Sequence, residues 1–348
     1  MTRFGDFAPL CHQVPSYPCP ALAQLQHHNP SVLTGVSANF TSAPIGVNPE
    51  CGTPRVGFDG SLANIANIIA CGLSIIFVTI LVLWTSRRKA AVGRVEMRAF
   101  LVLYLLTLPM QLISTGAFLE QGSTALTAIT AVHAGLVAAT FWTLVGTAIV
   151  STQVVEDGTL ASLIPYYFFT LVFFVVTGYI ALDVGFTFST VFGPSNPPEA
   201  LHSIPLFVFT NIWPGAAALI YFAIMLYVVL GMLNEVRPMW YYVLAAVLFV
   251  LSQLDFYLLS KVICKGASQK IDGTFVATVL ETAAVAVLYF AWRSITEGES
   301  PLAVVGLAGS SVRDGAGTGC LNALVPAVMS SLMLPAAIAL WSGHCFLL

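Results

Sequence analysis

Three ionisable side chains lie inside long apolar stretches of this 348-residue sequence, namely Asp255, Glu281 and His133. A charged group inside a bilayer is costly, so such residues usually line a proton path or a polar ligand pocket, or persist as neutral groups hydrogen-bonded to neighbours. The apolar stretches contain no Lys or Arg that could pair with either acid. We therefore favour the hydrogen-bonded, structural role over a proton relay for both carboxyl groups. The polar residues that could act as partners are Asn211, Thr210, Gln253 and His133.

Seven apolar stretches must position these groups, and each is long enough to cross the roughly 30 Å hydrocarbon core of a bilayer as a helix. They cover Leu62–Thr85, Ala99–Ala117, Thr124–Val150, Leu160–Leu182, Ile204–Gly231, Met239–Ser260 and Gly273–Trp292. Hydrophobic residues make up 57% of the chain, charged residues 8%, and the mean hydropathy is +0.87. A soluble domain could not bury so much apolar surface. The sequence therefore predicts an all-α polytopic membrane protein, built as a seven-transmembrane helix bundle.

Basic residues just after the first stretch indicate how the bundle is oriented. They are Arg87, Arg88, Lys89 and Arg94. Short basic loops stay on the cytoplasmic side of a membrane, so the segment before the first stretch would be lumenal or extracellular. Lys261, Lys265 and Lys270 fall on the opposite side of this arrangement, but they are a minority of the basic residues.

Composition divides the chain into four parts. Residues 1–60 are rich in Pro, Ser, Asn and Gly and should form an irregular lumenal cap over the bundle of residues 61–293. The glycine-rich residues 294–320 are typical of a flexible linker, here on the cytoplasmic side. Residues 321–348 are apolar again and could form an eighth span or lie at the membrane interface. A net charge of −3 and a pI near 6.0 argue against a nucleic-acid partner.

Four of the seven cysteines fall on the predicted lumenal side: Cys11, Cys19, Cys51 and Cys264. An oxidising lumen favours disulfides, and four cysteines allow three pairings. We expect at least one bridge, and a bridge from the cap to Cys264 would tie the cap to the bundle. Asn39 begins an Asn-Phe-Thr sequon for N-glycosylation on the same side.

The sequence contains no arrangement of residues that is typical of catalysis. It has no nucleophile with a nearby base, and its Cys and His residues lack the spacing of metal ligands, so we expect no enzyme, metal or cofactor. Two other classes remain open from the residues alone. A seven-helix chemosensory receptor is one, although its cytoplasmic loops would be short. A small lipid transporter or proton-coupled transporter is the other, although few polar groups could line its path.

Several stretches of the sequence resemble the fungal chitin synthase export chaperone family. These stretches are 4–7 with Cys11 and Cys19, 91–96, 155–159, and the run from 253–255 through 261–264, 270–273 and 281–282 to 291–297. They occur in the expected order from residue 4 to residue 297, so the resemblance covers the whole bundle.

The resemblance implies a client-specific chaperone of the endoplasmic-reticulum membrane that supports synthesis of cell-wall chitin. The client would be a chitin synthase, which the chaperone helps to fold and to leave for the cell surface. Members of the family can travel with their client, which implies a second location in the plasma membrane and contact with the vesicle-coat export machinery. The apolar residues 321–348 depart from the family pattern, in which the C-terminus is polar and cytoplasmic.

Overall fold

A computed structural model describes residues 4–7, 10–11, 19, 56–57, 63–88, 92–120, 123–154, 156–189, 191–192, 202–268 and 270–296. Within these residues, seven helices are long and apolar enough to cross a membrane. Five of them are single helices: α3 (Ile65–Arg87), α4 (Arg94–Thr115), α5 (Thr124–Ser151), α6 (Leu160–Phe186) and α11 (Gly273–Thr296). The fifth span consists of α7 (Ile204–Phe207), η3 (Val208–Ile212), α8 (Trp213–Tyr227) and η4 (Val228–Met232). The sixth consists of α9 (Arg237–Leu254), η5 (Asp255–Leu259) and α10 (Ser260–Gly266). The predicted all-α bundle of seven spans is confirmed.

The helical ends differ from the predicted spans because helices continue past the apolar residues. The second span begins at Arg94 rather than Ala99, and the fourth runs on to Phe186. These extensions bring Glu96 and Asp183 into helices, where both side chains are buried. The expectation that Asp255 and Glu281 are the only acids of the spans was therefore too narrow.

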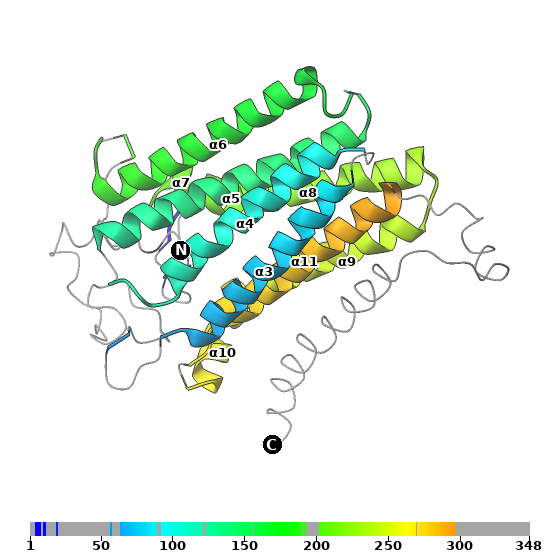
Figure 1. The fold of residues 1–348 in the computed structure, drawn as a ribbon. Coiled ribbons are helices and arrows are strands. Elements are labelled where there is room, and N and C mark those ends of the chain that lie inside the picture. Colours follow the sequence, from blue (N-terminus) through cyan, green and yellow to red (C-terminus); the bar gives the residue numbers. More distant parts are fainter. Residues whose placement is uncertain are drawn as a thin grey trace. The chain divides into compact units, whose positions relative to one another are not determined.

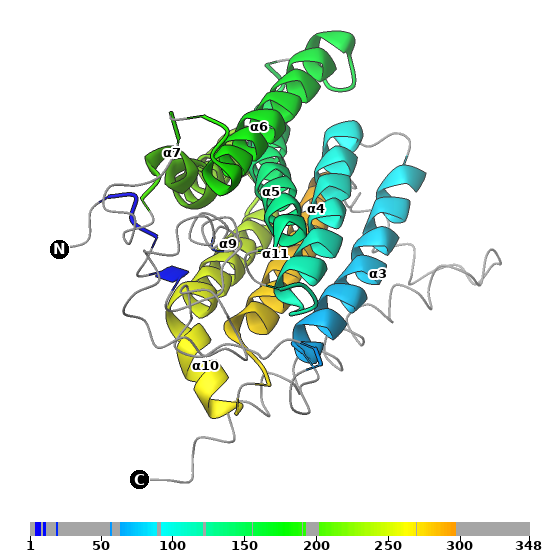
Figure 2. The ribbon, with the colours of Figure 1, turned by 90° about the vertical axis from the view of Figure 1, so that its left-hand side faces the viewer.

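Two helices occupy the interior of the bundle, as Figures 1 and 2 show. The helix α5 packs against α4, α6 and α8, while α11 packs against α3 and α9. Both are far more buried along their apolar windows than the outer helices α6 and α9. The chain thus places its two least lipid-exposed helices at the centre, with the others around them.

The sequence of α5 explains why other helices approach it closely. Its buried face consists largely of Ala, Gly and Thr, and the Thr hydroxyls donate to carbonyl groups one turn earlier, as Thr147 does to Thr143 at 2.8 Å. A Cβ added at Gly135 would lie 2.7 Å from the carbonyl oxygen of Phe174 on α6. The glycine at this position therefore lets α6 pack closely against α5, as small residues do between membrane helices.

The two ends of the bundle differ in what they carry. The cap end is where α3, α5, α7 and α11 begin, and it holds residues 4–7 together with Lys261, Lys265 and Lys270. The basic end is where α4, α6 and α9 begin. It carries Arg87, Arg88, Arg94, Arg98, Arg237 and Arg293. Most of residues 1–60 and everything after Thr296 lie outside the described residues, so the four-part division stays a prediction.

Candidate functional site

A polar seam joins α11 to α3 and α4 inside the bundle. Thr274, Thr278 and Thr282 recur every four residues on α11 and so lie on one face of it. Thr282 donates to the Ser74 hydroxyl of α3 at 2.9 Å, and Gln111 of α4 donates its amide to the Thr278 hydroxyl at 2.8 Å. Side-chain hydrogen bonds thus replace apolar contacts along three neighbouring helices, which fixes the register in which they pack.

Asp272 ends this seam at the cap end of the bundle. Its carboxyl group accepts from the Asn64 amide at 2.9 Å, and from the backbone N–H groups of Thr274 and Phe275 in the first turn of α11. Asp272 therefore acts as the N-cap of α11 and, through Asn64, joins α11 to the start of α3. Sequence reasoning did not single this residue out, although an acid just before an apolar helix is a typical capping signal.

Burial of Asp272 makes its ionisation depend on folding. The side chain is 4% exposed, and desolvation raises its pKa above the usual 3.8, while the hydrogen bonds from Thr274 and Asn64 lower it. A carboxyl group whose pKa is raised in the folded state favours folding most at acid pH. Its contribution declines as pH rises through the folded-state pKa.

We expect Asp272→Asn to remove this pH dependence, because the amide keeps an acceptor oxygen for Asn64 but does not ionise. Melting temperatures of the purified protein between pH 4 and 7 provide the measurement. Relative to the variant, the wild type should lose stability as pH rises. Identical slopes for the two proteins would show that Asp272 does not titrate in this range.

Three of the polar residues named from the sequence, Gln253, Asn211 and Thr210, form side-chain hydrogen bonds here, and Gln253 binds one of the two acids. Gln253 of α9 donates to the Oε1 atom of Glu281 at 3.2 Å, and Glu281 is half-buried. Asn211 accepts from the Tyr257 hydroxyl at 2.6 Å and donates to Thr210 at 3.0 Å. We call these five residues the Glu281 cluster.

Wide π-helical turns place the Glu281 cluster. Asn211 lies in η3 and Tyr257 in η5. Such turns are rare and interrupt the regular hydrogen-bond ladder, and they often occur at functional positions. Asp255 begins η5 and is half-buried, but its carboxyl group forms no hydrogen bond with the residues that the structure describes. His133 is buried on α5. The structural roles expected of Asp255 and His133 stay predictions.

The Gln253 contact gives a test of what Glu281 does. Glu281→Gln keeps the acceptor oxygen and should be tolerated. Glu281→Leu removes that acceptor and leaves the Gln253 amide only the Ser252 hydroxyl, at a cost of about 1–3 kcal/mol. Protein abundance, and export of the client that the resemblance implies, should therefore fall for Leu and not for Gln. If both variants lost export to the same extent at normal abundance, a proton-carrying role would replace the structural one.

Hydrogen bonds also join three segments of the chain at the basic end. The Gly93 N–H donates to the Oδ2 atom of Asp157 at 2.9 Å, and the Gly158 N–H donates to the Oε1 atom of Glu96 at 3.3 Å. The indole N–H of Trp292 donates to the carbonyl oxygen of Val92 at 2.9 Å. Three segments that lie far apart in the sequence, 92–96, 157–158 and the end of α11, are thus joined at one place.

Backbone pairing and apolar contacts hold the N-terminal residues on the bundle. Asp6 and His202 form an antiparallel bridge, and the Ser203 N–H donates to the Gly5 carbonyl oxygen at 3.1 Å. Gly5 adopts φ +94°, and a Cβ there would lie 3.1 Å from Ile204, so the position favours glycine. The side chains that form one buried apolar cluster with this segment are Phe7, Cys11, Cys19, Ala131, Ala134, Ile180, Ala181, Val184 and Leu206.

The cysteines predicted to be lumenal are only partly described. Cys11 and Cys19 form a disulfide with a Cα–Cα distance of 5.7 Å, which is one of the pairings that four cysteines allow. Cys264 is also disulfide-bonded. Cys51, Asn39 and Lys89 lie outside the described residues. The bridge from the cap to Cys264 and the glycosylation of Asn39 therefore stay predictions.

No group of three or more His, Cys, Asp or Glu side chains in the described part of the chain could hold a metal ion. Most of the polar groups described above bind one another, and these hydrogen bonds stabilise the helix bundle. Gly93, Glu96, Asp157 and Trp292 at the basic end, and Asp272 at the cap end, were visible in the sequence only as members of short motifs.

Comparison with known proteins shows which family this chain is similar to. The model of the chitin synthase export chaperone family matches residues 3–305. A chitin synthase export chaperone of Chaetomium globosum is 28% identical over 307 residues, which cover 86% of this chain and 85% of the relative. Relatives with the same description from Neurospora crassa and Yarrowia lipolytica are each 27% identical, over 87% and 86% of this chain and 80% and 87% of their own. No solved structure matches the chain.

Proposed function

Because this chain belongs to the chitin synthase export chaperone family, we propose that it is a membrane chaperone that helps a chitin synthase fold and leave the endoplasmic reticulum. The observation that carries the proposal is the family match over residues 3–305, which includes all seven spans. The relatives from Chaetomium globosum and Neurospora crassa bear the same description. This assignment favours a chaperone over the receptor and the transporter that the residues alone left open.

The chaperone acts without catalysing a reaction, and the placement of the family motifs supports this. Stretch 91–96 meets 155–159 through the Gly93–Asp157 and Gly158–Glu96 hydrogen bonds, and Trp292 of the last motif binds Val92. Residues of stretch 4–7 pair with His202 and Ser203. Residues in these motifs hold helix ends together, which is what a scaffold for another membrane protein requires.

The client's own membrane spans would meet the outer surface of the bundle. The helices α6 and α9 are the least buried of the seven along their apolar windows. Their exposed side chains include large apolar and aromatic groups such as Phe168, Leu171, Trp240 and Val247. Helices associate in a bilayer through packing and hydrogen bonds rather than through a hydrophobic driving force. Such a surface would hold a client weakly enough to release it for export.

The proposed orientation places the cap end in the lumen and the basic end in the cytoplasm. The arginine-rich loop after α3 supports this orientation through the positive-inside rule. The cap would then lie where disulfides form, in keeping with the Cys11–Cys19 bridge. The basic end would face the vesicle-coat machinery, and the chain could accompany its client to the plasma membrane.

Vesicle budding from isolated endoplasmic-reticulum membranes tests the proposed function. Membranes that contain the chain should package chitin synthase into vesicles, whereas membranes that lack it should package little of it. A second polytopic cargo, measured in the same vesicles, serves as the control. Equal packaging of chitin synthase from both kinds of membrane would contradict the proposal.

A further inference from the structure

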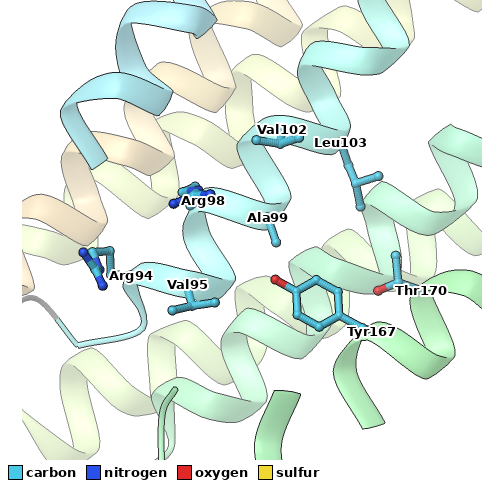
Figure 3. A pocket seen from close by; sticks show the side chains of 8 residues that line it. All are labelled: Arg94, Val95, Arg98, Ala99, Val102, Leu103, Tyr167 and Thr170. Atoms are coloured by element: carbon cyan, nitrogen blue, oxygen red, sulfur yellow. The ribbon is translucent and has the colours of Figure 1, made fainter. Parts of the chain in front are cut away.

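A groove of about 360 Å³ lies between α4 and α6 at the basic end of the bundle. Its walls consist of Arg94, Val95, Arg98, Ala99, Val102, Leu103, Tyr167 and Thr170. Figure 3 shows the Tyr167 ring extending from α6 toward α4, with Val95 and Ala99 across from it and the arginines to one side. The walls are apolar apart from the two guanidinium groups and the hydroxyl groups of Tyr167 and Thr170.

The groove has the length of one leaflet. From Arg94 to Leu103, α4 rises about 14 Å at 1.5 Å per residue, and half of a bilayer's hydrocarbon core is about 15 Å. Arg94 begins α4 and Arg98 lies one turn later, and Ala99, Val102 and Leu103 lie deeper along the helix. The groove therefore presents charge at the depth of lipid head groups and apolar surface at the depth of acyl chains.

The two guanidinium groups are available to an anion. Arg98 is exposed and Arg94 is half-buried, and within the described residues neither is paired with a carboxylate. The neighbouring acids Glu96 and Asp157 accept hydrogen bonds from the backbone N–H groups of Gly158 and Gly93. Glu96 is also buried, whereas Arg98 is exposed. The mouth of the groove is therefore positive.

The shape and charge of the groove favour a lipid as its occupant. Its apolar walls run for about 14 Å along α4, which suits an extended acyl chain, and its arginines lie at one end, which suits a charged head group. Basic pockets between membrane helices on the cytoplasmic side bind anionic lipid head groups.

We propose that this groove binds an anionic phospholipid of the surrounding leaflet. Arg94 and Arg98 hold the head-group phosphate, and one acyl chain lies along Ala99, Val102 and Leu103 against the Tyr167 ring. The lipid fills the space between α4 and α6, where direct helix packing is incomplete. This binding does not depend on the chaperone function, because it concerns the chain in a bilayer without its client.

Native mass spectrometry of the purified full-length protein tests the proposal, with phosphatidylserine and phosphatidylcholine as the probes. The wild type should bind phosphatidylserine at least about tenfold more tightly than phosphatidylcholine. Arg94→Gln with Arg98→Gln should weaken phosphatidylserine binding about 30-fold, since each basic residue near an anionic lipid contributes about a fivefold factor. Arg94→Lys with Arg98→Lys should retain most of the binding.

Two further variants separate a built groove from general surface charge. Ala99→Phe fills the groove without changing any charge and should also abolish the preference for phosphatidylserine. Lys261→Gln with Lys265→Gln removes the same charge at the cap end and should leave binding unchanged. Melting temperatures show whether each variant folds. If the double arginine-to-glutamine variant does not fold, Ala99→Phe decides; if Ala99→Phe does not fold, the arginine variants decide. Unchanged binding in Ala99→Phe, or an equal loss in the cap-end control, would overturn the proposal.

Discussion

In cells that lack this chain, a chitin synthase is expected to accumulate in the endoplasmic reticulum, and the chitin content of the wall should fall. The reason is that a polytopic client whose spans have not assembled exposes polar and packing surfaces to lipid, which retains it until a partner covers them. The family match over residues 3–305 identifies chitin synthase as the client class. Microscopy of each tagged chitin synthase and staining of wall chitin provide the measurement.

Selectivity is the control for this first prediction. Bulk secretion and the delivery of an unrelated polytopic protein should continue, because the chaperone is specific for its client. Returning the chain to the same cells should restore surface delivery. Normal surface delivery of every chitin synthase in cells without the chain would contradict the chaperone account, and a general block of secretion would contradict its client specificity.

The second large effect is expected from Gly273→Ala at the start of α11. A Cβ at this position would lie 2.6 Å from the Asp255 carbonyl oxygen and 2.7 Å from the Cα and Cβ atoms of Ser260. These atoms belong to the backbone or sit next to it, so a side-chain rotation cannot relieve the overlap. The Gly273 N–H also donates to the Ser260 hydroxyl at 3.1 Å. We expect a cost of about 1–3 kcal/mol or more.

Gly215→Ala is the matched control for Gly273→Ala. Gly215 lies inside α8, where an added Cβ meets no atom within 4 Å, so this variant should be neutral or slightly stabilising. Melting temperature in detergent and abundance in membranes provide the measurements, and export of the client should fall in step with abundance. Equal stability of the two variants would show that α11 can shift away from η5 and α10 at little cost.

Much of this architecture could be predicted from sequence because a bilayer imposes a length on every apolar segment. The predicted span Thr124–Val150 and the helix Thr124–Ser151 differ by one residue at one end. The misplaced ends include Ala99, Leu182 and Ser260, beyond which the helical segments extend to Arg94, Phe186 and Gly266 and include charged residues. Glu96 and Asp183 lie just outside the apolar runs, but both are helical, and their carboxylates accept hydrogen bonds from Gly158 and Ser189 respectively.

Asp183 illustrates why these ends could not be predicted. Its two carboxylate oxygens accept from the N–H and the hydroxyl group of Ser189, each at 2.6 Å, beyond the end of α6. Hydropathy treats a buried acid as a reason to end a span, because it cannot include a partner supplied by the following turn. The same limit hid Asp272, whose partner Asn64 lies 208 residues earlier in the chain.

Four members of the Glu281 cluster were named from the sequence, but Tyr257 and the pairing were not. Gln253 and Asn211 were two of several possible partners in the sequence, and the structure joins Gln253 to Glu281 and Asn211 to Tyr257. The π-helical turns η3 and η5 shift the side-chain register within their helices. A helical periodicity read from sequence assumes a constant register, so it could not place these side chains.

Co-purification tests most directly the central claim, that this chain contacts a chitin synthase while both reside in the endoplasmic reticulum. The tagged chain would be solubilised in mild detergent from membranes in which vesicle budding is blocked. Proteins recovered with the wild type and with Gly215→Ala would be quantified by mass spectrometry. Gly215→Ala should fold and give the same result as the wild type. The account predicts that a chitin synthase is enriched well above other polytopic proteins of the same membrane. Recovery of no chitin synthase, or of every polytopic protein in proportion to its abundance, would contradict it.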